Sequence, residues 1–312
     1  MTKTVEIVIY IHGVSQSPQE GAHYEEYGQL HKGIGNNIRQ KPWPQDYCGV
    51  EWGGNPFNQP NPKNHMLLTK AQRLLGSRVM PVIDSTSDWT WNPARLAVES
   101  IRKLALYGFS DMFYYVSADG KKAVRSAVAK QITDFITKQK ITKNDLLSIT
   151  LIGHSAGSVA AFDFLFYLFS GSRSACEFCK ENHKASDEMS KLEKRITRGK
   201  LRLRRLVTFG SPLSFTIFRN DDVLDILAGD QQLNPSDYGL TTGPNHDLDG
   251  PRWINLWDKD DPVSFPVEPL VDQSGNPGLV LDVYSDVSDL VTLAHNAYWS
   301  NKDVHGEIAR RW

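Results

Sequence analysis

The stretch that decides the fold is Leu147-Ser-Ile-Thr-Leu-Ile-Gly-His-Ser-Ala-Gly-Ser158, which continues as Val159-Ala-Ala-Phe-Asp-Phe-Leu165. It predicts an apolar strand, then the turn Gly153-His-Ser-Ala-Gly157, then an apolar helix. A serine between a strand and a helix lies on a sharp turn, so the residues two positions away on each side must be small. Its hydroxyl projects from the end of the strand, and the N–H of Ala156 points toward the oxyanion of an attacked carbonyl. The pattern predicts that Ser155 is a catalytic nucleophile.

The first apolar run of the chain, Val5–Ile11, is followed by His12, Gly13 and Val14. An early strand that ends in His-Gly resembles the α/β-hydrolases, in which the loop after such a strand supplies the second oxyanion donor. We therefore expect the N–H of Val14 to complete the oxyanion hole. His12 is expected to brace this loop and not to act as the catalytic base.

A catalytic acid should follow the serine and precede the catalytic histidine. The predicted strand Trp253–Trp257 is followed by Asp258-Lys-Asp-Asp-Pro262, which places three carboxylates at the carboxyl end of a strand. We select Asp261 because Asp-Pro favours a turn where the acid must point inward. Asp258 and Asp260 are expected to be solvated turn residues.

The candidate base is His295, which lies beyond one further predicted strand. This is the place in the chain order Ser, Asp, His where the base is expected. The alternative is His305, ten residues further along on a charged terminal helix. Chain order favours His295.

These residues predict a serine hydrolase that cleaves carboxylic esters, with a small-molecule or lipid ester as substrate and phospholipid acyl esters as the lipid case. Ser155 would attack the carbonyl, His295 would move the proton, and Asp261 would orient the imidazole. No cofactor and no metal is expected. Two alternatives stay open: a thioesterase or acyltransferase with the same triad, and a catalytically silent lipid-binding module.

Strand-like and helix-like patterns alternate along the chain. Asn92-Pro93 predicts the start of a helix over Pro93–Tyr107, and apolar spacing over Val124–Ile136 predicts another. The alternation predicts an α/β fold with a mostly parallel sheet of about seven strands and helices on both faces. The predicted strands are Val5–Ile11, Cys48–Trp52, Asp111–Val116, Leu147–Ile152, Leu203–Phe209, Trp253–Trp257 and Gly278–Tyr284.

The motifs run from His12 to His295, so residues 1–312 are expected to form a single α/β-hydrolase domain. Two stretches interrupt the alternation. Gly53–Trp91 is rich in Pro, Asn and Trp, and Gly171–Lys200 is charged and helix-prone. Both are predicted to be insertions over the sheet, in the position of a lid or cap.

The composition of the chain restricts the cellular compartment and the classes of binding partner that we expect. The 312 residues carry a net charge of −1, which argues against a nucleic-acid partner. Three cysteines in a chain of this length do not form a disulfide framework. With no signal-peptide pattern and no apolar run long enough to span a membrane, we expect a cytoplasmic location.

Several segments together resemble the DDHD-type intracellular phospholipases, which prefer phosphatidic acid, and their bacterial α/β-hydrolase relatives. The resemblance extends over residues 5 to 305 in outline and implies the same fold and a lipid ester substrate. The matching segments are Asp111-Met-Phe-Tyr-Tyr115, Gly153-His-Ser-Ala-Gly-Ser-Val159, Thr208-Phe-Gly-Ser-Pro-Leu213, Asp261-Pro-Val-Ser-Phe-Pro-Val-Glu-Pro-Leu270 and His295-Asn-Ala-Tyr-Trp-Ser-Asn-Lys-Asp303.

By this resemblance, the quartet that gives the family its name would fall on Asp261, Asp282, His295 and Asp303. The segment that begins at Asp261 is also similar to the acid loop of fungal triacylglycerol lipases. Both resemblances favour Asp261 over its neighbours as the triad acid.

Two further patterns admit a plain and a functional interpretation. The basic stretch Lys191–Arg205 is expected to be a solvated helix face that leads into a strand, with peripheral contact to an anionic membrane as the alternative. Cys176, Cys179 and His183 have the spacing of part of a zinc site, but a closed structural site needs four ligands. We expect two reduced thiols and no metal there.

Overall fold

The structure is a computed structural model, which describes a subset of the 312 residues. These are residues 3–13, 23–39, 42–52, 115, 118–170, 187–216, 232–240, 250–288 and 291–312. The insertion predicted over Gly53–Trp91 and the helix predicted over Pro93–Tyr107 lie outside them.

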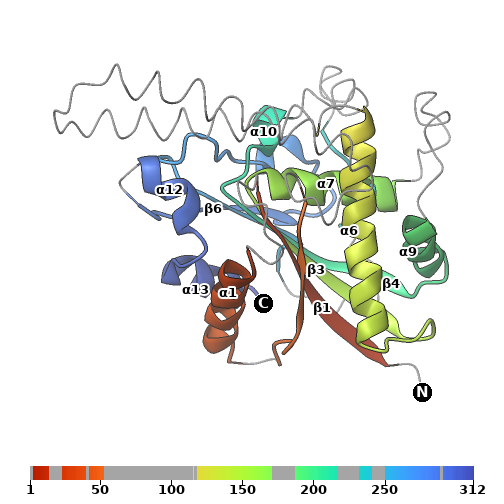
Figure 1. The fold of residues 1–312 in the computed structure, drawn as a ribbon. Coiled ribbons are helices and arrows are strands. Elements are labelled where there is room, and N and C mark those ends of the chain that lie inside the picture. Colours follow the sequence, from red (N-terminus) through yellow and green to blue (C-terminus); the bar gives the residue numbers. More distant parts are fainter. Residues whose placement is uncertain are drawn as a thin grey trace, which may run out of the picture.

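The centre of the molecule is a parallel sheet of six strands in the order β2-β1-β3-β4-β5-β6 (Figure 1). This confirms the α/β class with a parallel sheet. The strands are β1 Thr4–Ile11, β2 Tyr47–Val50, β3 Leu146–His154, β4 Leu201–Phe209, β5 Trp253–Trp257 and β6 Val280–Tyr284.

The prediction of about seven strands is wrong by one in the described part of the chain. Of the predicted strand Asp111–Val116, only Tyr115 is described, and its backbone is helical. Its ring is buried 5.7 Å from the ring of Trp52, and its hydroxyl donates to the carboxylate of Asp163. The rest of this predicted strand lies outside the described residues.

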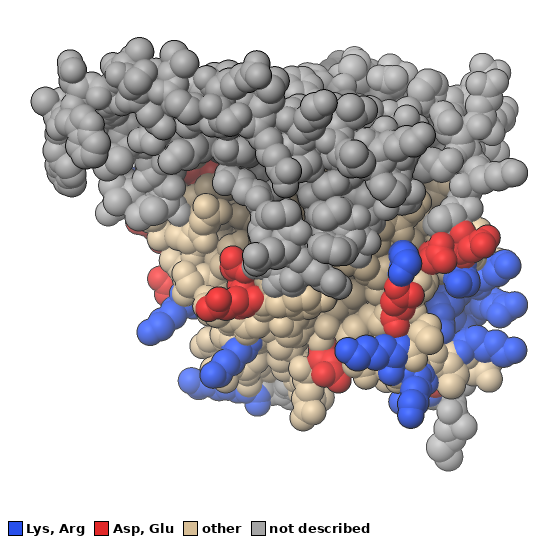
Figure 2. Space-filling view, in the orientation of Figure 1, with Lys and Arg blue, Asp and Glu red and all other residues tan. Residues whose placement is uncertain are grey.

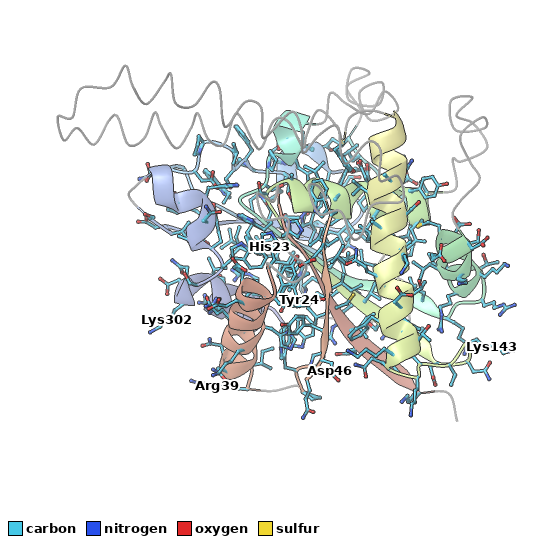
Figure 3. All side chains as sticks on the ribbon, in the orientation of Figure 1. His23, Tyr24, Arg39, Asp46, Lys143 and Lys302 are labelled. Atoms are coloured by element: carbon cyan, nitrogen blue, oxygen red, sulfur yellow. The ribbon has the colours of Figure 1, made fainter. Side chains whose placement is uncertain are left out.

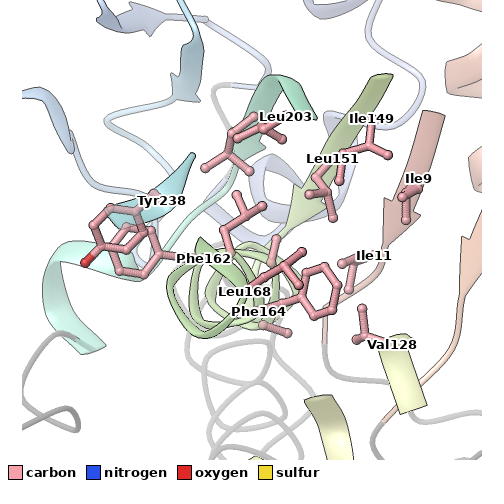
Figure 4. Packing of buried hydrophobic residues seen from close by; sticks show 14 of the residues in the cluster. Ile9, Ile11, Val128, Ile149, Leu151, Phe162, Phe164, Leu168, Leu203 and Tyr238 are labelled. Carbon is pink, nitrogen blue, oxygen red and sulfur yellow. The ribbon is translucent and has the colours of Figure 1, made fainter. Parts of the chain in front are cut away.

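The two faces of the sheet are covered by different helices, because alternate residues of a strand point to opposite faces. In β1, Ile9 and Ile11 belong to the core formed with α6 and α7, which Figure 4 shows from close by. Val8 and Tyr10 belong to the core formed with α1 and α13. The helices are α1 Tyr24–Asn37, α6 Ala118–Lys138, α7 Ala156–Phe169, α9 Asp187–Thr197, α10 Leu213–Thr216, α12 Val291–Ala297 and α13 Lys302–Arg310, with short 3-10 turns η4 Pro235–Tyr238 and η5 Glu268–Leu270.

The helix predicted over Val124–Ile136 is the central part of α6. The end of the insertion predicted over Gly171–Lys200 is α9, which buries Met189 and Leu192 in the same core as α6. The preceding part of this insertion lies outside the described residues. None of the described helices is both long enough and apolar enough to cross a membrane.

The order of the strands reverses between β1 and β3, and this reversal distinguishes the carboxyl ends of these two strands from the rest of the sheet. From β1 the chain moves outward to β2 and then returns to the other side of β1 for β3. In open parallel sheets, the crevice outside the carboxyl ends of the strands at such a reversal is where ligands bind. His12 follows β1 and Ser155 follows β3 at this point, so the two predicted site segments meet there.

Candidate active site

Ser155 joins β3 to α7 in a strained backbone conformation, with φ of 53° and ψ of −130°. A non-glycine residue with positive φ is uncommon, and such strain persists only where the surroundings impose it. The N–H of Ser155 donates to the carbonyl of Phe209 at 3.1 Å, and the residue is 6% exposed. The hydroxyl therefore lies in a defined position at the carboxyl edge of the sheet.

Steric contacts explain the small residues around this serine. A Cβ on Gly157 would lie 2.2 Å from the carbonyl oxygens of Ile11 and His12, and a Cβ on Gly153 would lie 2.6 Å from the Cα of Ser158. Because backbone atoms cannot give way as a flexible side chain can, both positions require glycine.

Ser155, His295 and Asp261 form one chain of hydrogen bonds. His295 lies on α12, and its Nε2 is 2.8 Å from the hydroxyl oxygen of Ser155. The other ring nitrogen, Nδ1, is 3.0 and 3.1 Å from the two carboxylate oxygens of Asp261. The Asp261 side chain is fully buried and also accepts the N–H of Val263 at 3.1 Å. The structure thus brings together the three residues that the sequence selected for a triad.

The three carboxylates of the loop after β5 have different surroundings and different hydrogen-bond partners. Asp258 accepts the N–H of Asp260, as expected of a turn residue, but it is not solvated. It is fully buried, and its other oxygen accepts the N–H of Val287 at 2.7 Å. The expectation of a solvated Asp258 is wrong because the segment after β6 returns over this loop. Asp260 is partly exposed.

His12 is held between several neighbours at the end of β1. The N–H of Trp52 donates to its Nε2 at 3.2 Å, so the proton of the neutral ring is on Nδ1, which donates to the carbonyl of Gly13. Its ring stacks on that of His23, with centroids 3.9 Å apart, and Figure 3 labels His23 beside the sheet. Burial, and then the nearby His23, lower the pKa of His12 well below its usual range. His12 is a neutral brace.

The glycine after His12 gives the loop room. A Cβ on Gly13 would lie 2.7 Å from the Cβ of Ser155, so the backbone here passes directly beside the serine. Ala156, the first residue of α7, is the other predicted source of an oxyanion donor. The first N–H groups of a helix have no partner within the helix. Val14, the predicted second donor, lies outside the described residues.

His154, directly before the serine, was not selected from the sequence. Its Nε2–H donates to the backbone carbonyl of His295 at 2.7 Å and so ties β3 to α12. Burial, and then His295, lower the pKa of His154 well below its usual range, which keeps the ring neutral. The only signal for this role in the sequence was the presence of His154 within the turn motif.

The segment Thr208–Leu213, known from the sequence only as part of the family resemblance, supports the turn from the side of β4. The hydroxyl of Ser211 is 2.7 Å from that of Ser158, which in turn donates to the carbonyl of Ser155. Gly210 has φ of 56°, and a Cβ there would lie 3.2 Å from an oxygen of Asp261. The segment therefore contacts both the nucleophile turn and the acid.

Other candidate residues lie away from this chain of hydrogen bonds. The ring of His305 is buried against Gly33 and hydrogen-bonds the carbonyl of Trp299 at 2.8 Å. Asp282 accepts the N–H groups of Val267 and Glu268, which fastens η5 to β6. Asp303 is exposed in the first turn of α13.

Two groups of residues carry side chains of the metal-ligand type. Carboxylate oxygens of Asp258, Asp260 and Asp286 lie within 4.8 Å of one another, but the oxygens of Asp258 already accept backbone N–H groups. Cys48 is a buried thiol whose pKa burial raises to about 12. Cys176, Cys179 and His183 lie outside the described residues.

The basic stretch Lys191–Arg205 divides into two parts. The lysines and arginines of α9 lie at the surface, on the side where Figure 2 shows such side chains gathered. Arg204 and Arg205 are buried in β4. The stretch is thus a surface helix face that leads into a strand, as expected, and the strand part buries Arg204 and Arg205.

Comparison with known proteins assigns this chain neither a family nor a function. Neither the protein-family models nor the curated proteins gave a match. One similar solved structure is that of an uncharacterized protein from Pseudomonas aeruginosa, at 12% identity and a TM-score of 0.38. The match covers 99% of this chain and 46% of that one, so this chain spans less than half of its length. A likeness at this level carries no argument about function.

Proposed function

We propose that the protein is an α/β-hydrolase that cleaves carboxylic esters through an acyl-enzyme on Ser155. The observation that carries the proposal is the chain of hydrogen bonds from Ser155 through His295 to the buried Asp261. Nucleophile, base and orienting acid within hydrogen-bond reach are the geometry that serine catalysis needs. Support also comes from the strained turn at the carboxyl edge of a parallel sheet.

The proposed reaction uses these residues in turn. As Ser155 Oγ attacks the ester carbonyl, its proton passes to Nε2 of His295, and Asp261 stabilises the imidazolium through Nδ1–H. The N–H of Ala156 donates to the oxyanion. His295 then protonates the leaving alcohol, and water, deprotonated by His295, releases the acid from Ser155.

The substrate class follows from sequence resemblance and remains a proposal. We infer a lipid or phospholipid acyl ester, by the resemblance of Asp261–Leu270 and His295–Asp303 to DDHD-type phospholipases. A thioesterase or acyltransferase would form the same acyl-enzyme, since only the acceptor differs.

The test is a panel of p-nitrophenyl esters, phospholipids and acyl thioesters, assayed with the wild-type protein and with Ser155→Ala. The proposal predicts turnover of at least one oxygen ester by the wild type and none above background by the variant. Turnover that Ser155→Ala retains would exclude the mechanism. Turnover of thioesters alone would assign the alternative chemistry.

A further inference from the structure

A second polar cluster lies on β4, away from the proposed active site. The pairing of β4 with β3 shifts by one residue between Leu203 and Arg205, so that Arg204 is an extra residue in the strand. A β-bulge of this kind changes the direction of a side chain. Both arginines reach Trp312: their guanidinium carbons lie 4.3 Å (Arg204) and 5.9 Å (Arg205) from the centroid of its ring.

Arg205 is fully buried, and its charge is not balanced. Its Nε–H donates to the carbonyl of Pro251 at 3.0 Å. Its Nη1 and Nη2 are buried and have no hydrogen-bond partner in the described part of the chain. Burial, followed by Arg204, Arg252 and Arg311, lowers the pKa of Arg205 to about 9. The group is still protonated at neutral pH, and its charged neighbours are cations.

The neighbouring carboxylates already have partners. Glu6 of β1 forms an ion pair with Arg204. Glu307 of α13 forms ion pairs with Arg310, at 2.7 Å, and with Arg311. Among the described residues, no carboxylate therefore remains for Arg205. A buried ion without a counter-charge is strongly unfavourable, so this arrangement calls for an anion.

Two more unmatched groups belong to the same cluster. The indole Nε1–H of Trp312 is buried with no partner among the described residues. The hydroxyl of Thr150 is also buried without one, and Thr150 is the residue of β3 that pairs with Arg205. All of these groups can donate hydrogen bonds, and an indole or guanidinium N–H can only donate. The missing ligand must therefore be an acceptor.

We propose that Arg205, Trp312 and Thr150 form a binding site for a small tetrahedral oxyanion of the size of inorganic phosphate. The guanidinium fork of Arg205 presents two parallel N–H donors, an arrangement that suits two oxygens of one phosphate. Of the three residues, Trp312 is the most exposed, at 9%, against 1% for Thr150 and 0% for Arg205, so the anion would enter past its indole.

The site is separate from the proposed triad and does not depend on it. Thr150 precedes Ser155 by five residues in β3, which corresponds to about 16 Å at the rise of a parallel strand. A phosphate here would compensate charge in the amino-terminal half of the sheet.

The test is titration calorimetry of the purified full chain with inorganic phosphate, after dialysis into chloride buffer of matched ionic strength. Wild type should bind one phosphate per chain. Arg205→Met should bind at least about tenfold more weakly, the loss of one charge-assisted contact. Arg198→Met, which removes an exposed arginine after α9, should bind as the wild type does.

Trp312→Phe provides a second variant in case Arg205→Met does not fold, because it keeps the ring and removes only the N–H donor. It should weaken phosphate binding severalfold. Sulfate should compete with phosphate, and acetate should not. The proposal is overturned if wild type shows no saturable phosphate binding, if acetate competes equally, or if Arg198→Met weakens binding as much as Arg205→Met.

Discussion

The triad at the carboxyl edge of the sheet and the arginine cluster on β4 both consist of buried polar side chains, but among the described residues only the triad side chains are all hydrogen-bonded within the chain. Around Ser155, the side chains of His154, His295 and Asp261 all have hydrogen-bond partners within the chain. Around Arg205, both terminal guanidinium nitrogens and the indole N–H of Trp312 are buried without an acceptor among the described residues. The triad is therefore held by bonds within the chain, whereas the cluster is the place for which we propose an anionic ligand.

The largest expected effect tests whether the triad edge is a catalytic site. His295→Ala should lower kcat for ester cleavage by about 10⁴-fold or more, because Nε2 of His295, 2.8 Å from the hydroxyl oxygen of Ser155, is the base proposed to take its proton. The matched control is His305→Gln, a change at another buried histidine, which should leave kcat unchanged. Steady-state kinetics on proteins whose folding is verified by circular dichroism provide the comparison. Equal losses in both variants would point to a structural effect.

The substitutions Asp261→Asn and Asp258→Asn distinguish the proposed catalytic role of Asp261 from the structural role of its buried neighbour Asp258. It should lower kcat by about 10³- to 10⁴-fold, because an amide neither fixes the tautomer of His295 nor stabilises its cation. Asp258→Asn should instead lower the free energy of unfolding by about 1–3 kcal/mol, since it weakens the contact with Val287. If Asp258→Asn gave the larger loss of kcat, the acid would have to be reassigned.

The rigidity of the nucleophile turn can be tested by a pair of glycine substitutions. Gly157→Ala should lower the free energy of unfolding by about 3 kcal/mol, since its Cβ would overlap two backbone carbonyls. Gly306→Ala should raise it by about 0.5–1 kcal/mol, because Gly306 lies in α13 with open space around it. Urea unfolding measures both, and a neutral Gly157→Ala would show that the turn is not tightly packed.

The last prediction concerns the dependence of stability on pH. The lowered pKa values of His12 and His154 mean that the unfolded chain binds more protons than the folded one below about pH 6.5. The free energy of unfolding should therefore fall by about 1.4 kcal/mol per pH unit for each histidine as the pH decreases. His154→Gln keeps an N–H donor and should flatten this slope in urea unfolding between about pH 7 and pH 5. An unchanged slope would contradict the assignment of a buried neutral ring.

The sequence predicted the nucleophile turn because its determinants are local. Strand, turn and helix are adjacent in the chain, and the contacts that exclude a Cβ at Gly153 come from the turn itself, whereas those at Gly157 come from Ile11 and His12 at the end of β1. Asp261 and His295 were selected by chain order and by the carboxyl ends of parallel strands, and the structure places both beside Ser155.

The features that the sequence did not predict depend on contacts between segments that are far apart in the chain. The burial of Asp258 requires the return of the chain after β6, and the inward position of both Arg204 and Arg205 depends on a one-residue shift in strand pairing. A basic stretch that crosses from a helix into a strand has the same composition whether its arginines face water or the core. Composition alone therefore could not separate α9 from β4.

The most direct measurement of the central claim is reaction with a fluorophosphonate probe, followed by mass spectrometry of the labelled peptides. An activated serine reacts with such a probe, whereas an ordinary serine hydroxyl does not. We predict one adduct per chain, on Ser155, absent from Ser155→Ala and strongly slowed in His295→Ala. Labelling at another residue, or labelling that Ser155→Ala retains, would contradict the account.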